Sequence, residues 1–324
     1  MPSGHCRGTT VEIGVNVLGL EALFDGKVRP VLDFAAGADS AGIDLICTGD
    51  HLGFNADAHA QRVVEHNFLF PLDHPWYEPI SFLSSIAAVT ERARLGVSVL
   101  IATVRPAALL AKQVATLDSL SEGRTVMGFG VGWQEAEYTA TNMPFDARFG
   151  RMEETVAACR ELWTNAPATF KGRDFAFENY HSLPLPIQPR IPVLFGFGPS
   201  RRNFDRIARV ADGWTVNPTD LGTFTDSVAL LRNTFEAHQR DPESARVQVS
   251  AAPVRRDNGS VDLSATADKA RDWFARGASV VVLRPAVFDC AAEELPELLD
   301  WMTSIKEARH GPGTARSHRQ AGNP

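Results

Sequence analysis

The sequence has few cysteines and no cysteine motif. Its 324 residues include only Cys6, Cys47, Cys159 and Cys290, which lie far apart and form no C-x-x-C pair. Such a pair is the usual signature of zinc ribbons and redox-active dithiols. Cys47 and Cys159 stand in apolar runs, which favours small core residues over ligands or bridges. We therefore expect neither a metal site nor a disulfide framework.

Long apolar runs and an excess of basic residues are also absent. No stretch is long enough to span a bilayer, and the polar N-terminal sequence MPSGHCRGTT does not resemble a signal peptide. The formal net charge is −7, and the 32 lysines and arginines are dispersed along the chain. This distribution argues against nucleic acid or an anionic membrane surface as a partner. We expect a cytoplasmic protein that acts on a small-molecule substrate.

The two common phosphate-binding motifs are missing as well. The run GFGVGW, residues 128–133, differs from G-x-G-x-x-G because its third glycine comes one residue early and Trp133 takes the expected place. No G-K-[ST] follows any glycine run, so the sequence has no Walker-type loop.

The same glycine run belongs to an unusual predicted strand, residues 124–131. Gly128, Gly130 and Gly132 share one face, and large apolar side chains occupy the other. A glycine offers no side chain to pack, so a row of three indicates that something approaches the backbone closely. That neighbour is either an adjacent layer of a barrel or the flat ring of a cofactor, and the strand alone does not decide between them.

Strand and helix patterns alternate along the whole chain. The predicted strands are residues 11–17, 43–47, 95–101, 124–131, 192–196, 213–216, 247–252 and 279–283. The predicted helices are residues 29–41, 79–92, 106–120, 151–163, 202–210, 221–239, 266–276 and 293–308. This pattern predicts a single α/β domain, a (β/α)8 TIM-type barrel with a long loop after strand 2; a doubly wound open sheet is the alternative. We expect the barrel to span residues 11–308, between an N-terminal tail, 1–10, and a disordered C-terminal tail, 309–324.

Two segments carry a family resemblance. LDSLSEGRTVMGFGVGWQEAEY, followed by PFDARFGRMEETVAACRELW, resembles the luciferase-like superfamily of flavin- and deazaflavin-dependent oxidoreductases, and the likeness extends over residues 11–308. The D-H-L at residues 50–52, the S-V-L at 98–100 and the G-V-G-W at 130–133 look more like the deazaflavin branch. The resemblance implies a bound coenzyme F420 or, alternatively, FMN, and a possible homodimer.

Two of the candidate site positions surround the expected cofactor ring. Asp50 and His51 follow the second strand, where an ordinary turn would also explain them. The resemblance implies that this pair contacts the cofactor ring, and a histidine there is suited to proton transfer near neutral pH. We therefore predict His51 as catalytic and Asp50 as cofactor-binding. By position in the same family, Ser98 and Val99 are expected to form a non-proline cis peptide that bulges against the ring.

The third candidate position is the end of the glycine strand, Gly130, Gly132 and Trp133, which we also predict to contact the cofactor ring. Some deazaflavin relatives that oxidise sugars carry a glutamate where this chain has Trp133. Because that acid is absent, we do not expect sugar-phosphate oxidation by their mechanism.

The fourth candidate is the segment FGFGPSRR, residues 195–202. Its glycines allow backbone N–H groups to face an anion, and a serine there can cap the following helix. Two arginines then stand in the first turn, where the helix dipole disfavours cations, so a bound phosphate would relieve the conflict; two solvated arginines are the alternative. The resemblance places the cofactor phosphate at this loop, although its phenylalanine and proline depart from the family's Gly-Gly-Ser. The predicted binding residues are Gly196, Phe197, Gly198, Ser200 and Arg201.

The loop at residues 53–76, here called the mouth loop, is long for a barrel connection. Its aromatic residues are suited to wall a hydrophobic substrate pocket: Phe54, Phe68, Phe70 and Trp76. The spacing of its three histidines matches no metal-site pattern, so we predict no metal.

Together these features predict an F420-dependent enzyme that transfers hydride to or from a small unsaturated or carbonyl substrate. An FMNH2-dependent monooxygenase using O2 is the second possibility. A flavin-binding barrel without catalytic activity is a third, of another class. A storage protein has no need of the Asp50–His51 pair beside an aromatic loop, which favours an enzyme.

Overall fold

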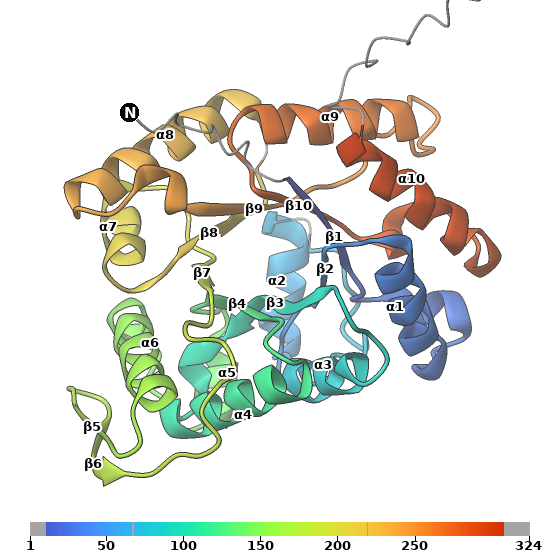
Figure 1. Ribbon diagram of the computed structural model, residues 1–324. Coiled ribbons are helices and arrows are strands. Elements are labelled where there is room, and N and C mark those ends of the chain that lie inside the picture. The colour runs from blue at the N-terminus through green and yellow to red at the C-terminus, as the bar shows by residue number, and fades with distance from the viewer. Residues whose placement is uncertain (1–10, 67, 219, 308–324) are drawn as a thin grey trace, which may run out of the picture.

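The computed structural model describes residues 11–66, 68–218 and 220–307, and the predicted tails at 1–10 and 309–324 lie outside the described residues. Eight parallel strands close into a barrel in the order β1-β10-β9-β8-β7-β4-β3-β2, and helices surround them (Figure 1). The barrel strands are β1 (Glu12–Asn16), β2 (Leu45–Thr48), β3 (Arg94–Ile101), β4 (Thr125–Gly130), β7 (Val193–Phe195), β8 (Gly213–Val216), β9 (Arg246–Ser250) and β10 (Val280–Leu283). The predicted (β/α)8 barrel is confirmed.

Eight helices that alternate with the strands form the outer layer: α1 (Arg29–Ala41), α3 (Pro79–Ala87), α4 (Ala107–Leu120), α6 (Arg148–Thr164), α7 (Arg201–Val210), α8 (Leu221–Ala237), α9 (Leu263–Ala275) and α10 (Leu295–Glu307). Short 3-10 helices lie in the connections: η1 (Leu20–Phe24), η2 (Ala102–Val104), η3 (Pro242–Ser244), η4 (Pro285–Val287) and η5 (Ala292–Glu294). No helix in the described part of the chain is long and apolar enough to cross a membrane.

The amphipathic pattern of the helices explains how the two layers join. On α4, Leu110, Val114 and Leu117 recur at helical spacing and are fully buried. Strands β2, β4 and β10 are buried along their whole length, as expected for a parallel sheet covered on one face by helices and filled on the other by its own side chains. The core is therefore a continuous layer between strands and helices.

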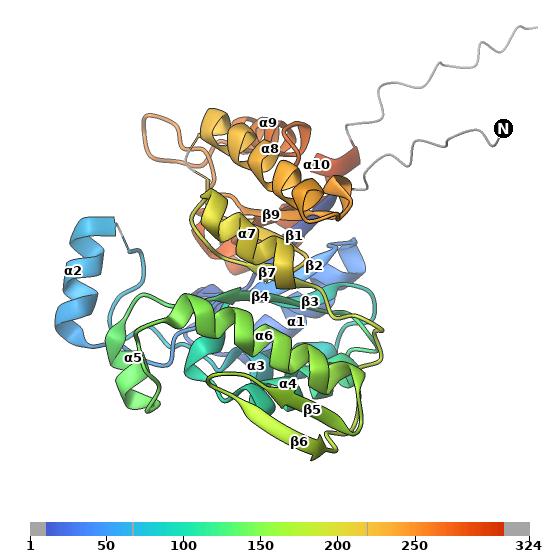
Figure 2. The ribbon, with the colours of Figure 1, turned by 90° about the vertical axis from the view of Figure 1, so that its left-hand side faces the viewer.

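Three elements interrupt the simple alternation. Helix α2 (Ala56–His66) lies within the mouth loop, which we had predicted only as a loop, and α5 (Glu135–Ala140) follows β4. Both lie at the same end of the barrel, and α2 stands clear of its body (Figure 2). The antiparallel hairpin of β5 (Ala168–Lys171) and β6 (Ala176–Tyr180) lies beside α6 and was not predicted.

One predicted helix, residues 79–92, ends five residues early, at Ala87. The backbone N–H groups of Glu91, Arg92 and Ala93 donate to the carboxylate of Asp39 at 2.6–2.9 Å. These bonds hold the segment in a turn, because an N–H group that is bonded to a side chain is not available to a helix. The prediction was wrong here since Asp39 lies on α1, far away in the sequence.

Candidate active site

The predicted site residues gather at the carboxyl ends of the barrel strands, the end at which barrel enzymes carry out their chemistry. Asp50 and His51 follow β2, Trp133 follows β4, and residues 196–201 follow β7. The mouth loop and α5 cover the same end (Figure 2).

His51 is held by a carboxylate that the sequence analysis did not assign to the site. Its Nδ1 lies 3.1 Å from Oε1 of Glu137 on α5, and the two side chains are 9% and 2% exposed. The backbone N–H of Leu52 donates to the same oxygen at 2.8 Å. A carboxylate at Nδ1 favours the tautomer in which Nδ1 carries the proton, so Nε2 is left to accept or release one.

A second residue near α5 fixes the start of the mouth loop. Gln134 accepts a hydrogen bond from the backbone N–H of Asn55 at 2.6 Å and donates to the carbonyl of Gly53 at 2.8 Å. Gln134 and Glu137 are three residues apart and both are buried, so together they fasten the mouth loop to α5. The sequence does contain one signal for Gln134 and Glu137: both belong to QEAEY, the segment directly after the glycine strand.

Aromatic rings enclose His51. The ring centroids of Phe54 and Trp76 lie 4.6 and 4.7 Å from that of His51, and those of Trp133 and Phe68 lie 5.7 and 6.0 Å away. The predicted aromatic wall of the mouth loop is therefore assembled around the histidine. Rings packed this closely keep water away, and electrostatic interactions strengthen where water is excluded.

Asp50 is engaged by protein groups. Arg105 donates to both of its carboxylate oxygens, at 2.7 and 3.0 Å, and the backbone N–H of Ile101 donates at 2.8 Å. All these groups are buried. In this arrangement Asp50 ties the end of β2 to the end of β3 and so places His51 beside it. Arg105 was not identified from the sequence, because nothing local marks it as a partner of Asp50.

The peptide bond between Ser98 and Val99 is cis, as the family resemblance implied. The register between β3 and β4 shifts at this point. A Cβ added to Gly130 would lie 2.6 Å from Val99, and one added to Gly196 would lie 2.8 Å from it. These two glycines therefore make room for the Val99 side chain, so the neighbouring layer of the barrel accounts for them without a cofactor.

Gly132 differs from the other glycines of its strand. Its φ of +64° lies in the left-handed region, and an added Cβ would meet the side chain of Ile101 at 2.9 Å. Glycine is needed at this position both for the backbone conformation and for the space. The chain turns here and directs Trp133 toward His51.

Some of the features predicted for the loop after β7 are present in the structure. Ser200 caps α7 by accepting from the N–H of Asn203 at 3.2 Å, and Gly198 is exposed with open space around it. Arg201 is exposed and forms no ion pair among the described residues. Phe197 is buried, so its side chain belongs to the core and not to a binding surface. Its predicted contact with the cofactor is limited to the backbone.

Arg148, at the start of α6, is another cation near this loop that we did not predict. Its guanidinium lies 5.5 Å from the ring centroid of Phe149, which in turn packs against Phe197 at 5.2 Å. Its Nε is buried and has no hydrogen-bond partner within residues 11–66, 68–218 and 220–307. A phosphate oxygen is the kind of acceptor that this group lacks.

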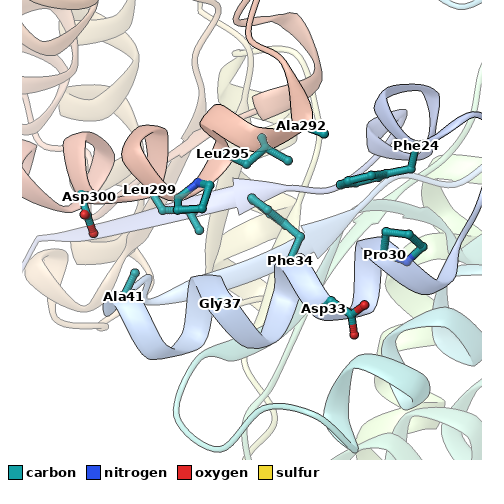
Figure 3. A pocket seen from close by; sticks show the side chains of 11 residues that line it. Phe24, Pro30, Asp33, Phe34, Gly37, Ala41, Ala292, Leu295, Leu299 and Asp300 are labelled. Carbon is teal, nitrogen blue, oxygen red and sulfur yellow. The ribbon is translucent and has the colours of Figure 1, made fainter.

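Other features lie outside the barrel mouth. An apolar groove of about 450 Å³ lies between α1 and α10 and is lined by residues such as Phe34 and Leu299 (Figure 3). None of the predicted site residues lines this groove. Burial raises the pKa of Cys47 and of Cys159 to about 12, so both thiols are unreactive near neutral pH. Within the described residues no three His, Cys, Asp or Glu side chains are placed to hold a metal ion.

Comparison with known proteins identifies relatives of this arrangement. The sequence profile of the family described as luciferase-like monooxygenase matches residues 11–320. An uncharacterized protein of Mycobacterium tuberculosis is 37% identical over 180 residues, which are 56% of this chain and 62% of that protein. An FMNH2-dependent dimethylsulfone monooxygenase of Pseudomonas fluorescens is 30% identical over 184 residues, 56% of this chain and 49% of the relative. This chain thus spans about half to two thirds of the length of these curated relatives.

Among solved structures, a coenzyme F420-dependent tetrahydromethanopterin reductase from Methanopyrus kandleri superposes with a TM-score of 0.70. The alignment covers 91% of this chain and 99% of the reductase at 15% sequence identity, so the likeness is one of fold.

Proposed function

Because this chain belongs to the luciferase-like monooxygenase family, we propose that it is an F420-dependent oxidoreductase that transfers hydride to or from a small unsaturated or carbonyl substrate. The observation that carries the proposal is His51. Its Nδ1 is fixed by Glu137, its Nε2 is left for proton transfer, and aromatic rings enclose it at the mouth of the barrel.

The residues at the mouth fit an elongated cofactor with an anionic end. Arg148 has a buried Nε without an acceptor, and Arg201 stands exposed in the first turn of α7 without an ion pair among the described residues. A phosphate near Gly198 would satisfy both cations and the N-terminus of α7. The bound deazaflavin would supply the two-electron chemistry that no side chain of this protein can provide.

The protein's own residues would bind, orient and exclude water. Nε2 of His51 gives a proton to the reacting molecule or takes one from it, and Glu137 keeps the imidazole turned for that transfer. Phe54, Trp76 and Trp133 exclude bulk water from the same space. This arrangement serves proton transfer at an apolar site.

An FMNH2-dependent monooxygenase is the second candidate. It is favoured by the sequence identity of 30% with the dimethylsulfone monooxygenase of Pseudomonas fluorescens. The aromatic enclosure of His51 suits that activity as well, because excluding water protects reactive species from hydrolysis.

The test is a calorimetric titration of the purified protein with F420 and with FMN, side by side. We expect F420 to bind at least tenfold more tightly than FMN. The reverse order would favour the monooxygenase, and binding of neither would overturn the proposal. A bound, reduced cofactor that is reoxidised no faster when carbonyl and unsaturated substrates are added would indicate a barrel without catalytic activity.

A further inference from the structure

Arg284 is a cation at the same mouth that has no anionic partner among the described residues. It directly follows β10 and is half-buried. Within the described residues its side chain forms no hydrogen bond or ion pair, and its guanidinium carbon lies 4.9 Å from the ring centroid of Phe70. Burial lowers the pKa of Arg284, and no neighbouring carboxylate counters this shift. A guanidinium remains charged in proteins, so this site carries an unbalanced positive charge.

Two more nitrogen atoms without partners lie around the same ring. The centroids of His74 and Trp76 are 4.6 and 4.9 Å from that of Phe70. Nε2 of His74 and Nε1 of Trp76 are both buried and have no hydrogen-bond partner in the described part of the chain, and the His74 side chain is 9% exposed. Buried polar groups are rarely left unpaired in folded proteins. Here two of them, together with the half-buried guanidinium of Arg284, surround one aromatic ring.

Two acids lie near this group, and neither forms an ion pair with Arg284 among the described residues. Glu21 faces the other side of His74, with 3.8 Å between its Oε1 and Nδ1, and burial raises the pKa of Glu21. Burial and the charge of Arg284 lower the pKa of His74, although Asp73 acts in the opposite direction. Arg284 is therefore left available for an anion from outside the described residues.

The position of the group links it to the proposed reaction centre. Phe70 contacts Trp76, and the ring centroid of Trp76 lies 4.7 Å from that of His51. A Cβ added to Gly19, in the turn after β1, would lie 3.6–3.8 Å from Phe70, His74 and Ala286. The group thus lies over the ends of β1 and β10, which are not neighbours of β7 in the barrel.

We propose that Arg284, with Trp76, binds an oxyanion of the substrate, so that the substrate is a small acid whose apolar part extends along Trp76 toward His51. Stacking on Phe70 uses the face of the guanidinium and leaves its N–H edge free to donate to a carboxylate, sulfonate or phosphate. Trp76 Nε1 can only donate, which suits the same oxygens. This inference rests on the proposed function for the reacting end of the substrate and on Arg284 for the charged end.

The test uses the full chain without cofactor and four ligands with the same octyl chain: nonanoate, octanesulfonate, octyl phosphate and 1-octanol. Calorimetry is expected to show at least one acid binding tenfold or more tightly than 1-octanol, and the tightest acid identifies the oxyanion. Arg284→Gln should abolish this preference and leave F420 or FMN affinity within threefold. Arg271→Gln, which removes the same charge from α9, where Arg271 pairs with Asp268, should change neither.

Three results would overturn the inference: 1-octanol binding as tightly as every acid, unchanged acid binding by Arg284→Gln, or loss of cofactor binding by that variant, which would assign Arg284 to the cofactor. If Arg284→Gln does not fold, Arg284→Lys replaces it. Lysine keeps the charge without the two-pronged donor edge, so acid affinity should fall at least threefold, and unchanged affinity would again overturn the inference. A preference for acids in a protein that binds neither cofactor would instead contradict the proposed function and leave this site standing.

Discussion

At the scale of single residues, the site depends on the pairing of His51 with Glu137. The imidazole has aromatic neighbours on several sides, and among the described residues its carboxylate partner is Glu137. Removing one member of a buried pair leaves the other without compensation, so substitutions here affect stability as well as chemistry. Variants that keep a hydrogen bond are therefore the most informative.

We predict that His51→Gln lowers turnover about a hundredfold, as loss of a proton-transfer group would. Glutamine can still donate to Glu137, so the melting temperature should change little and cofactor affinity should stay within about tenfold. Steady-state kinetics, a melting curve and a cofactor titration measure the three quantities. Unchanged turnover would make His51 a structural neighbour of the reaction centre.

We predict that Glu137→Gln retains cofactor binding and lowers turnover less than His51→Gln does. The amide can still accept from Leu52 N–H, but it no longer selects one tautomer of His51. Steady-state kinetics and a cofactor titration measure the two quantities. Turnover equal to that of the parent protein would show that Glu137 serves only to fasten the mouth loop.

At the scale of elements, the close approach of β3 and β4 depends on glycine. Val99 fills the space beside Gly130 and Gly196, and a β-branched side chain has few alternative rotamers with which to give way. The strand pair and the loop after β7 are thus packed around one side chain.

We predict that Gly130→Ala destabilises the protein by about 1–3 kcal/mol through overpacking against Val99. Gly37→Ala is the matched control, because Gly37 lies within α1 with open space around it. That change should stabilise by about 0.5–1 kcal/mol, since alanine favours a helix. Urea unfolding of both variants makes the comparison, and equal effects would contradict the packing described here.

The N-terminus of α7 gives a second prediction at this scale. In the absence of cofactor, Arg201→Glu should raise stability by about 0.3–1 kcal/mol, because an acid suits the first turn of a helix. The same change should weaken cofactor binding at least tenfold, since it replaces an attraction of about 1.5–3 kcal/mol by a repulsion. Melting curves with and without cofactor test both parts. A variant with the full cofactor-induced shift would place the phosphate elsewhere.

At the scale of the whole molecule, polar contacts between residues far apart in the sequence hold helices and turns against each other around the barrel. Asp39, on α1, is 6% exposed and binds three consecutive N–H groups of the turn before β3. Burial opposes its ionisation, but these N–H groups and the charge of Arg92 outweigh that effect and lower the pKa of Asp39. A carboxylate whose pKa is lowered by folding stabilises the folded state above its unfolded pKa, and this contribution disappears as the pH falls through the folded pKa.

We therefore predict that Asp39→Asn costs about 1–3 kcal/mol at pH 7, because an amide oxygen cannot accept as strongly as the carboxylate does. The difference from the parent protein should shrink as the pH falls below about 4, where the parent's own Asp39 takes up a proton. Urea unfolding at pH 7 and at the lowest pH at which both proteins fold tests this. A difference that does not depend on pH would exclude the carboxylate charge as its source.

The sequence by itself determined the barrel and the position of its mouth. Alternation of apolar strands with amphipathic helices is a local pattern, so all eight strands could be predicted, and Asp50, His51 and Trp133 could be assigned to their carboxyl ends. The cap at Ser200 is equally local, since it depends on a side chain and an N–H three residues apart. The family resemblance added the cis bond at Ser98, which nothing in the local chemistry indicates.

Only the tertiary structure decided which side chains contact the predicted site residues. Glu137 is 86 residues from His51, and Arg105 is 55 residues from Asp50. The approach of Val99 to Gly130 depends on the register of two strands, and the donors around Phe70 come together only when the mouth loop packs over β10. Such contacts are set by how packed elements face one another, and a local pattern of residues carries no record of that geometry.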